Sequence, residues 1–503
     1  MARIGFGRKE GWVAVLAIAG ALLFLGWAAL GAGPGFPLDD GWIHQTYARN
    51  LAQRGVWSYG PGDVSAGSTA PLWTLLLAAG YALSVPHFWW TYLLGILTLV
   101  WMGWAGMVLW RALWPAQAGQ AWAGGAVVVL SWPLLWAAVS GMETLLFMAL
   151  AVTVLALYAG DRPAGPWLGF LGGLLVLVRP EGLLLLLLLA AGLALRRDWR
   201  GLVLFVVMLV LPLLPYFALN LSLSGQMWPN TLYAKQAEYA TLQMQPLPWR
   251  FVRLLYLSAG GPEVGWQGMS GARLLLVPGL LWAGWRAVRV DLRAQRLGYT
   301  LPLLWAGGHL LAYAWRLPVT YQHGRYLWPA VPIWIVYGLH GWGALLAGMR
   351  QRWGRPGRLL AQVAVLTFAL LLLIFVGLGA GAYKADVAFI EGEMVDVAHW
   401  LRENTPPEAL VAAHDIGAIG YFARRPLLDL AGLISPEVVP MLADEARLAR
   451  YVLESEASYL VTAPGWPYLA LTGRDDVVRL YDTGYAWTRE QGWNNMAVYH
   501  LPE

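Results

Sequence analysis

Two adjacent carboxylates, Asp39 and Asp40, follow the first hydrophobic run of the chain, where they could act on a hydroxyl group. Neighbouring carboxylates repel each other, so the pKa of one can rise toward the working pH and make it a general base. The simpler alternative is that one of them caps a helix, because Asp is a favoured N-cap residue. Capping needs only one carboxylate, and both interpretations stay open.

Glu143 and His44 are candidates for the same site. They could hold the molecule that carries the reacting hydroxyl group, or a metal ion. A helix that begins at Asp40 places His44 one turn further on, and Glu143 precedes another hydrophobic run. The acids Asp39, Asp40 and Glu143 could bind Mg²⁺ or Mn²⁺, which prefer oxygen ligands. Glu143 could instead be an acid that the N-terminal dipole of a helix favours. The metal dependence is therefore left open.

Several cationic groups could stabilise a phosphate. Lys235 is one of only three lysines in a chain that otherwise uses arginine, and Arg325 and His323 lie together in the segment TYQHGRYLWP. Each could also be an ordinary anchor at a membrane surface, because Lys and Arg extend along apolar surfaces to reach water. We interpret Arg49 as such an anchor. The pair His414-Asp415 is not taken as a metal site, because no motif supplies further ligands.

The composition indicates which class of protein positions these residues. The chain has 503 residues, of which 58% are hydrophobic and 13% charged, whereas soluble proteins have about 25% charged residues. A soluble enzyme is therefore excluded. The net charge of +5 does not indicate a nucleic-acid partner, because the arginines lie in short loops between apolar runs, which is typical of membrane topology.

Eleven apolar runs predict an all-α polytopic membrane domain with about eleven transmembrane helices, because a spanning helix needs about 20 apolar residues. Two of the runs are short and flank Arg179-Pro180-Glu181 as a hairpin. The first run lacks a signal-peptide cleavage site and is interpreted as a retained span. The runs cover residues 11–30, 88–110, 121–139, 144–159, 166–178, 183–195, 202–222, 274–288, 301–315, 326–346 and 359–382.

Basic residues recur in every second loop, which predicts a multi-pass protein of the cell membrane with a cytoplasmic N-terminus. The alternation also indicates that Pro71–Leu83 is not a span but a helix at the outer membrane surface. The basic residues are Arg3, Arg8, Lys9, Arg111, Arg162, Arg196, Arg197, Arg200, Arg286, Arg289, Arg293, Arg296, Arg350, Arg352, Arg355 and Arg358.

Two domains are expected from this topology. Residues 1–383 would form the membrane domain, with interfacial helices of the first outer loop within residues 34–84. Residues 384–503 would form an extracytoplasmic α/β domain, since an amphipathic helix near Val387–Glu403 is followed by short apolar runs separated by Gly, Pro and Asp. These predicted strands cover residues 409–413, 426–430, 458–462 and 496–501.

The short hairpin has a consequence for Arg179. Each arm has about 13 residues and so reaches roughly 20 Å as a helix, whereas the hydrocarbon core is about 30 Å thick. The tip is therefore predicted to lie below the outer interface and to form the floor of a cavity under the Asp pair. Arg179 would meet a carboxylate or a phosphate there, because buried charges need partners. The alternative is that the helices are longer and the tip reaches the interface.

From Asp39 to about Pro329, the chain resembles the superfamily C (GT-C) glycosyltransferases, and most closely the actinobacterial arabinofuranosyltransferases and their uncharacterised bacterial relatives. The hallmark is the paired acid after the first span, although the residues that follow it, Gly41-Trp42, depart from the expected pattern. Similar flanking segments are Tyr47-Ala48-Arg49-Asn50-Leu51, Ser68-Thr69-Ala70-Pro71-Leu72-Trp73, Gly141-Met142-Glu143-Thr144, Arg179-Pro180-Glu181-Gly182 and Gly324-Arg325-Tyr326.

The resemblance implies an inverting glycosyltransferase that moves a sugar from a polyprenyl-phosphate donor to a glycan, lipid or protein of the cell envelope, on the outer face of the membrane. Asp40 is the candidate base, and Asp39 would tune it or bind the acceptor. Four residues are candidates for binding the donor phosphate, because a departing phosphate needs cationic stabilisation: Lys235, Arg325, His323 and Arg179. A transporter or flippase, or a polymerase of lipid-linked saccharides, is the alternative.

Overall fold

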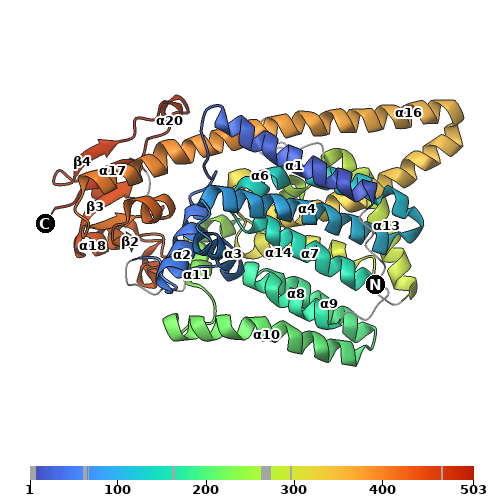
Figure 1. The fold of residues 1–503 in the computed structure, drawn as a ribbon, viewed down its shortest axis with the longest axis horizontal. Coiled ribbons are helices and arrows are strands. Elements are labelled where there is room, and N and C mark those ends of the chain that lie inside the picture. Colours follow the sequence, from blue (N-terminus) through green and yellow to red (C-terminus); the bar gives the residue numbers. More distant parts are fainter. Residues whose placement is uncertain are drawn as a thin grey trace.

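The computed structural model describes residues 7–60, 65, 67–160, 165–261, 273–294, 297–465 and 468–502. Arg3, Arg162 and Arg296 therefore lie outside the described residues. Figure 1 shows an elongated bundle of helices with a small α/β unit at one end. At the centre of the bundle α7 (Thr144–Ala159) is buried along nearly its whole length. The architecture is the predicted one, a helical membrane domain with a C-terminal α/β domain.

The bundle is that of a multi-pass membrane protein. Among the described residues, four helices are long and apolar enough to cross a membrane, or five if a bent pair is counted as one span. The shorter apolar helices include both arms of the predicted hairpin, α8 and α9. The helices that form the bundle are α1 (Arg8–Ala29), α4 (His87–Leu113), α5 (Ala121–Val129), α6 (Trp132–Val139), α7, α8 (Gly165–Val178), α9 (Gly182–Leu195), α10 (Trp199–Ser224), α13 (Val277–Ala294), α14 (Leu301–Arg316) and α16 (Val331–Phe389).

The third apolar run, 121–139, is broken into α5 and α6, which are bent by 60° together with the preceding 3₁₀ turn Pro115–Gln120. Pro133 at the start of α6 explains the break, because proline lacks an N–H and clashes with the carbonyl four residues earlier. The bend turns α6 across the bundle, where Trp136 donates a hydrogen bond to Asp386 at 2.8 Å.

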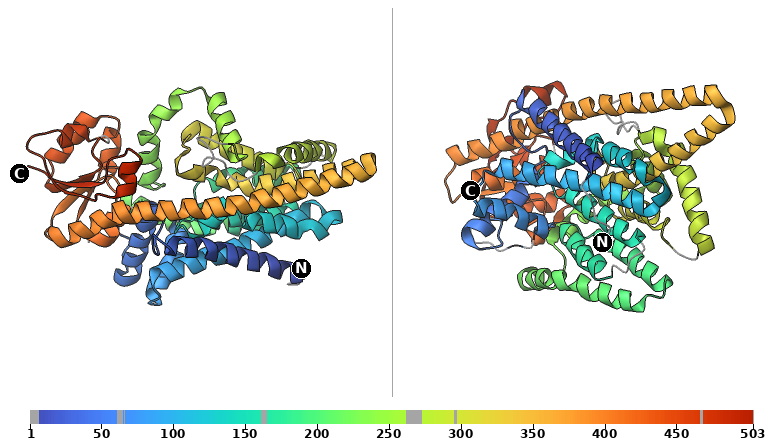
Figure 2. Two further views of the ribbon diagram at one scale, coloured as in Figure 1. Left: turned by 90° about the horizontal axis from the view of Figure 1, so that it is seen from above. Right: turned by 45° about the vertical axis from the view of Figure 1, so that its right-hand side comes forward.

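The last two apolar runs belong to the single long element α16. The chain reverses within it at Gly354, whose φ of 57° places it in the left-handed region. After the reversal the helix returns along the whole bundle to the α/β domain, as Figures 1 and 2 show in orange. A π-helical segment, Ile390–Val395, and α17 (Asp396–Asn404) continue it. The helix therefore passes without interruption through the domain boundary expected at residues 383–384.

Short helices lie where the bundle meets the α/β domain. They are α2 (Asp40–Arg54), α3 (Pro71–Ala82) and α11 (Asn230–Glu238), whereas α12 (Leu247–Ser258) packs on α14. With 12 residues, α3 reaches about 18 Å and is too short to span a membrane. It packs against α2 and α4, so the segment between α1 and α4 forms a compact layer on the bundle.

The C-terminal domain has a five-stranded mixed sheet in the order β2-β1-β3-β5-β4. Strands β1 (Leu410–Ala413), β2 (Leu427–Asp429) and β3 (Ala457–Thr462) are parallel, and β5 (Ala497–His500) joins antiparallel. These four strands match the predicted runs. The edge strand β4 (Val478–Asp482) was not predicted, because its mostly exposed residues have no clear hydrophobic alternation. The helices of this domain are α18 (Glu445–Leu453), α19 (Leu469–Thr472) and α20 (Ala486–Glu490).

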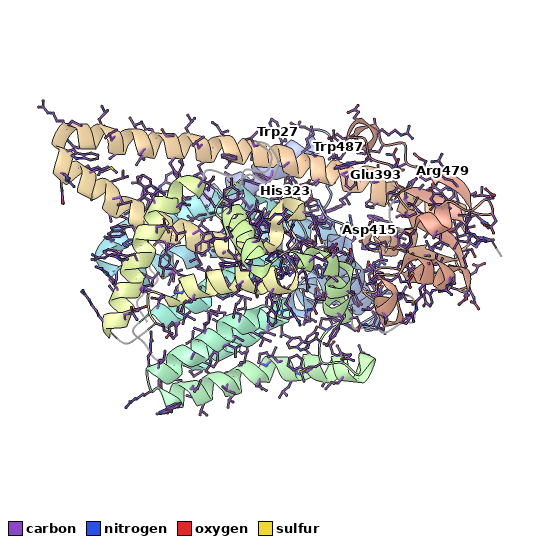
Figure 3. The ribbon with its side chains drawn as sticks, turned by 180° about the vertical axis from the view of Figure 1, so that it is seen from behind. Trp27, His323, Glu393, Asp415, Arg479 and Trp487 are labelled. Carbon is purple, nitrogen blue, oxygen red and sulfur yellow. The ribbon has the colours of Figure 1, made fainter. Side chains whose placement is uncertain are left out.

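A buried carboxylate joins the long helix to this sheet. Glu393, labelled in Figure 3, lies in the π-helical segment and is 1% exposed. It accepts hydrogen bonds from Thr483, Thr488, Asn495 and the backbone N–H of Met496, at 2.5 to 2.8 Å. Because a buried charge is costly unless fully hydrogen-bonded, this network ties the end of the returning helix to the domain that it carries.

Candidate active site

A cavity of about 320 Å³ lies between α2, the tip of the α8–α9 hairpin, α11 and the 3₁₀ turn Arg325–Ala330. This volume is at the lower end of the range for small-ligand sites. The cavity has an apolar part and a charged part. Its ionisable lining residues are Asp40, His44, Glu143, Arg179, Glu181, Lys235, Tyr313, Arg316, Arg325 and Tyr326.

Asp40, Lys235 and Arg325 meet in the charged part of this cavity. Lys235 Nζ is 3.7 Å from Asp40 Oδ2, and Arg325 Nη2 donates a hydrogen bond to the same oxygen. Tyr326 accepts hydrogen bonds from both cations, at 3.3 Å and 3.2 Å. Burial alone would raise the pKa of Asp40, but Lys235 and Arg325 outweigh it and hold that pKa well below its usual range.

A strained turn aims Arg325 at Asp40. Gln322 and His323 have φ values of 53° and 58°, in the left-handed region that costs a residue with a side chain roughly 1–3 kcal/mol. His323 Nε2 lies 2.8 Å from Asp386 Oδ2, which holds the turn in place. Figure 3 labels His323 at this position. His323 is absent from the described cavity lining. In this structure it holds the turn, and its contact with the donor phosphate stays a prediction.

The hairpin tip forms one wall of the cavity, through Arg179, Pro180 and Glu181. Arg179 donates hydrogen bonds to Glu143 at 2.7 Å and to Glu181 at 3.0 Å. His44 Nε2 lies 3.2 Å from the other oxygen of Glu143. Arg179 is therefore a largely buried cation with two carboxylate partners, which offset much of its desolvation. Glu143 and His44 lie beside it.

Asp39 makes different contacts from its neighbour. It precedes α2, but its side chain makes no capping hydrogen bond to that helix. Its two oxygens instead accept hydrogen bonds from the backbone N–H groups of Gly417 and Ala418 in the C-terminal domain, at 2.6 Å and 2.7 Å. Burial and the nearby Asp415 raise the pKa of Asp39 to about 7. The capping interpretation is therefore wrong, and the second carboxylate is explained by a contact between domains.

Arg49 also contacts the C-terminal domain rather than the membrane surface. It is 9% exposed, donates a hydrogen bond to the carbonyl of Tyr421 at 2.8 Å, and lies 4.5 Å from the centre of that ring. Trp42 packs beside it against Tyr421 and Phe422. One face of α2 thus carries Asp40 and His44 to the cavity while another face is packed against the α/β domain.

The carboxylates do not gather around a point where a cation could sit. Among the described residues no group of three or more His, Asp or Glu side chains has the arrangement of a metal site. Asp39 is bound by two N–H groups, Asp40 by two cations and Glu143 by Arg179 and His44. As arranged here, these donors do not fit a resident divalent cation, because each carboxylate is already paired and the three do not converge.

Among the lining residues that make informative contacts, Tyr313, Leu433 and Ile434 were not singled out from the sequence, and Tyr326 was named only within a motif. Tyr313 and Tyr326 bridge the charged groups, and Leu433 and Ile434 bring the C-terminal domain into the cavity wall. The loop that carries these two is held by the buried Asp429, which accepts hydrogen bonds from two of its backbone N–H groups. Tyr313 lies within the predicted span 301–315 and Tyr326 begins the predicted span 326–346, so neither was marked as a site residue, and nothing local marks the loop.

Solved structures with the same fold include ArnT from Cupriavidus metallidurans. In the apo state it has a TM-score of 0.59 and 16% identity, covering 98% of both chains. Its structure bound to undecaprenyl phosphate gives a TM-score of 0.58. The oligosaccharyltransferase of Archaeoglobus fulgidus, tethered to an acceptor peptide, has a TM-score of 0.59 and 14% identity over 91% of this chain and 69% of that chain.

Two other matches do not strengthen the fold assignment. The mycobacterial arabinofuranosyltransferase AftD has a TM-score of 0.47, which is too low to add to the fold assignment, and 16% identity over 98% of this chain and 41% of that chain. A domain family of unknown function, DUF8728, matches residues 385–499. No curated protein is matched by this sequence.

Proposed function

Because the chain has the superfamily C glycosyltransferase fold, we propose that it transfers a sugar from a polyprenyl-phosphate donor to an acceptor hydroxyl on the outer face of the membrane. The observation that carries the proposal is the meeting of Asp40 with Lys235 and Arg325 in one cavity. A base and a phosphate-binding pair within a few ångströms are what such a transfer requires.

The donor class is supported from two directions. Lys235 and Arg325 provide two cations on one side of the cavity, and Arg is suited to bidentate binding of phosphate. One neighbour of the same fold was solved with undecaprenyl phosphate and another with a dolichol-phosphate. A polyprenyl phosphate is therefore the chemical class proposed here, without a choice among its sugars.

The reaction follows from these positions. The acceptor oxygen attacks the anomeric carbon, and its proton passes to Asp40 as the new bond forms. The bond from the anomeric carbon to the phosphate oxygen breaks, and its electron pair stays on the leaving polyprenyl phosphate. Lys235 and Arg325 stabilise that added negative charge. A single direct displacement inverts the anomeric centre.

Asp40 is paired with both cations before the donor binds. When the donor's phosphate takes up Lys235 and Arg325, their hold on Asp40 weakens and its basicity rises. Binding of the donor thus prepares the base, which limits proton uptake by Asp40 in the empty site.

Replacing Asp40 tests the function. Asp40→Asn should lower transfer by roughly 10²- to 10⁴-fold, the usual contribution of a general base, and should leave polyprenyl phosphate binding intact or tighter. The measurement is release of polyprenyl phosphate from a panel of polyprenyl-phosphate sugars by protein in nanodiscs. Asp476→Asn is the matched control, because Asp476 is exposed in the C-terminal domain and pairs only locally with Arg474. Transfer at the wild-type rate by Asp40→Asn would contradict the proposal, and lipid translocation without transfer would indicate a transporter.

A further inference from the structure

The turn His414–Ala418 directly follows β1, in the part of the sheet where the strands are parallel. In open α/β sheets the carboxyl ends of parallel strands are the usual place for functional contacts. Here that edge is not free, because the turn lies against the membrane domain. Figure 3 labels Asp415 at this junction between the α/β domain and the bundle.

The turn contacts α2 through Asp39. Gly417 and Ala418 donate their backbone N–H groups to the two oxygens of Asp39, and the carbonyl of Ile416 accepts a hydrogen bond from Tyr59 at 2.5 Å. The approach is so close that a Cβ on Gly417 would stand 2.0 Å from the backbone oxygen of Asp39. Only glycine fits there, and Asp40 is the next residue along the chain.

The same turn contacts α11 through His414. His414 Nε2 lies 3.6 Å from Glu238 Oε1, and its other ring nitrogen lies 3.0 Å from the hydroxyl of Tyr468. Burial alone would lower the pKa of His414, but its hydrogen bond to Glu238 raises it and favours the ion pair. Glu238 lies on the same helix as Lys235, about one turn further on.

We propose that the His414–Ala418 turn is a positioning element that sets the spacing of Asp40 and Lys235, and that Asp39 and Glu238 act through it as positioning residues. One short segment of the C-terminal domain is bound to both helices that carry the charged groups of the cavity. The docked domain therefore holds the base and the phosphate-binding lysine in register. This inference rests on the proposed function for its chemical meaning, but its geometry is independent of it.

We infer that Asp39 does not take the proton of the acceptor. Both of its oxygens are occupied by N–H groups of another domain, so taking a proton from an acceptor would require the domain to leave. Asp39→Asn keeps one acceptor oxygen and removes one hydrogen bond, because the new NH₂ group cannot accept from the second backbone N–H. It should still retain transfer within about 10-fold of wild type, since the base Asp40 is unchanged. Asp40→Asn should be far more damaging. Equal loss in the two variants would overturn the assignment of Asp39.

Gly417→Ala is the sharper test, because it adds a methyl group at the contact and changes no cavity side chain. It should lower kcat for transfer at least 10-fold while changing the Kd for polyprenyl phosphate less than 3-fold, because it displaces Asp40 rather than Lys235. Gly381→Ala in α16 is the matched control, since its added Cβ meets nothing within 4 Å. An unchanged kcat in Gly417→Ala would overturn the proposal.

His414→Gln should show the opposite pattern if the turn holds both helices. It weakens the contact with Glu238 and so with the helix of Lys235, and should raise the Kd for polyprenyl phosphate more than it lowers kcat at saturating donor. A general loss of folding would move both quantities together in all variants. Parallel losses in Gly417→Ala and His414→Gln would therefore contradict separate control of the two helices.

A distance measurement makes the test independent of activity. The chain has no cysteine, so spin labels can be placed at Gln53→Cys on α2 and Tyr233→Cys on α11, both exposed. Gly417→Ala should shift or broaden the distance distribution between them, and Gly381→Ala should not. If this response appears while no polyprenyl-phosphate sugar is a donor, the positioning stands and the proposed function fails. An unchanged distribution would overturn the positioning.

Discussion

At the scale of the residue, the ion pairs of Asp40 predict how its basicity changes when donor binds. In the free enzyme Lys235 and Arg325 keep the pKa of Asp40 well below its usual range. A bound phosphodiester neutralises those cations, so the pKa rises toward its ordinary value. A base is active only when ionised, and its rate falls as the pH drops through its pKa. The acid limb of kcat should therefore lie about one pH unit or more above the acid limb of kcat/KM.

The check is a pair of pH–rate profiles, together with the profile of Lys235→Gln. Removing this cation should move the acid limb of kcat/KM upward, toward that of kcat, because Asp40 loses part of its stabilisation in the free enzyme. The same substitution should also weaken donor binding. Acid limbs of kcat and kcat/KM that coincide in the wild type would contradict the exchange of partners at Asp40.

The charged residues of the site could be proposed from the sequence, but their partners could not. Asp40 was singled out as half of an acid pair, and Lys235 and Arg325 were singled out as cations that could stabilise a phosphate. Asp39 was misinterpreted because its donors lie 378 and 379 residues away. A hydrogen bond to a distant backbone N–H leaves no mark in local sequence, because every residue except proline has that group.

At the scale of the element, the α8–α9 hairpin could be predicted because the lengths of its two apolar arms can be read from the sequence. Two arms of 14 residues reach only about 21 Å, and their tip lines the cavity. Its depth below the membrane surface stays a prediction. The break between α5 and α6 was predictable in principle from Pro133 but was hidden by the unbroken apolar run. The edge strand β4 was missed because an exposed edge needs no apolar face.

The hairpin yields a labelling prediction. Pro180→Cys places a thiol at the tip without removing Arg179, and Pro180 lines the cavity. A membrane-impermeant thiol reagent should label it slowly, and polyprenyl phosphate should slow the labelling a further 10-fold or more, because the lipid phosphate fills the space above the tip. Arg474→Cys, exposed in the C-terminal domain, should react rapidly with or without lipid. Rapid labelling at residue 180 regardless of lipid would place the tip at the interface instead.

At the scale of the whole molecule, the two ends of the bundle differ in chemistry. The α/β domain occupies one end, with α2 and α11 beside it, and the described N-terminal residues lie toward the other end, as Figure 1 shows. Residues of α2 and α11 line the cavity. At that other end Arg111 pairs with Glu10, and Lys9 donates a hydrogen bond to the carbonyl of Gly119. The reversal of α16 at Gly354, beside four arginines at 350, 352, 355 and 358, also points away from the α/β domain.

This separation predicts the orientation of the chain in the membrane. Short loops rich in arginine stay on the cytoplasmic side, so the reversal at Gly354 should be cytoplasmic and residues 384–503 should be outside. Protease added to intact cells should cleave a site inserted in the exposed Asp475–Asp476 segment, and should spare one inserted beside Gly354 until the membrane is opened. Replacing all four arginines of the reversal by glutamine should weaken the preference for this orientation, whereas replacing Arg402, Arg447, Arg450 and Arg479 of the outer domain should not. Cleavage at Gly354 in intact cells would contradict this orientation. The cavity would then lie on the cytoplasmic face, where a sugar donor of the outer leaflet could not reach it.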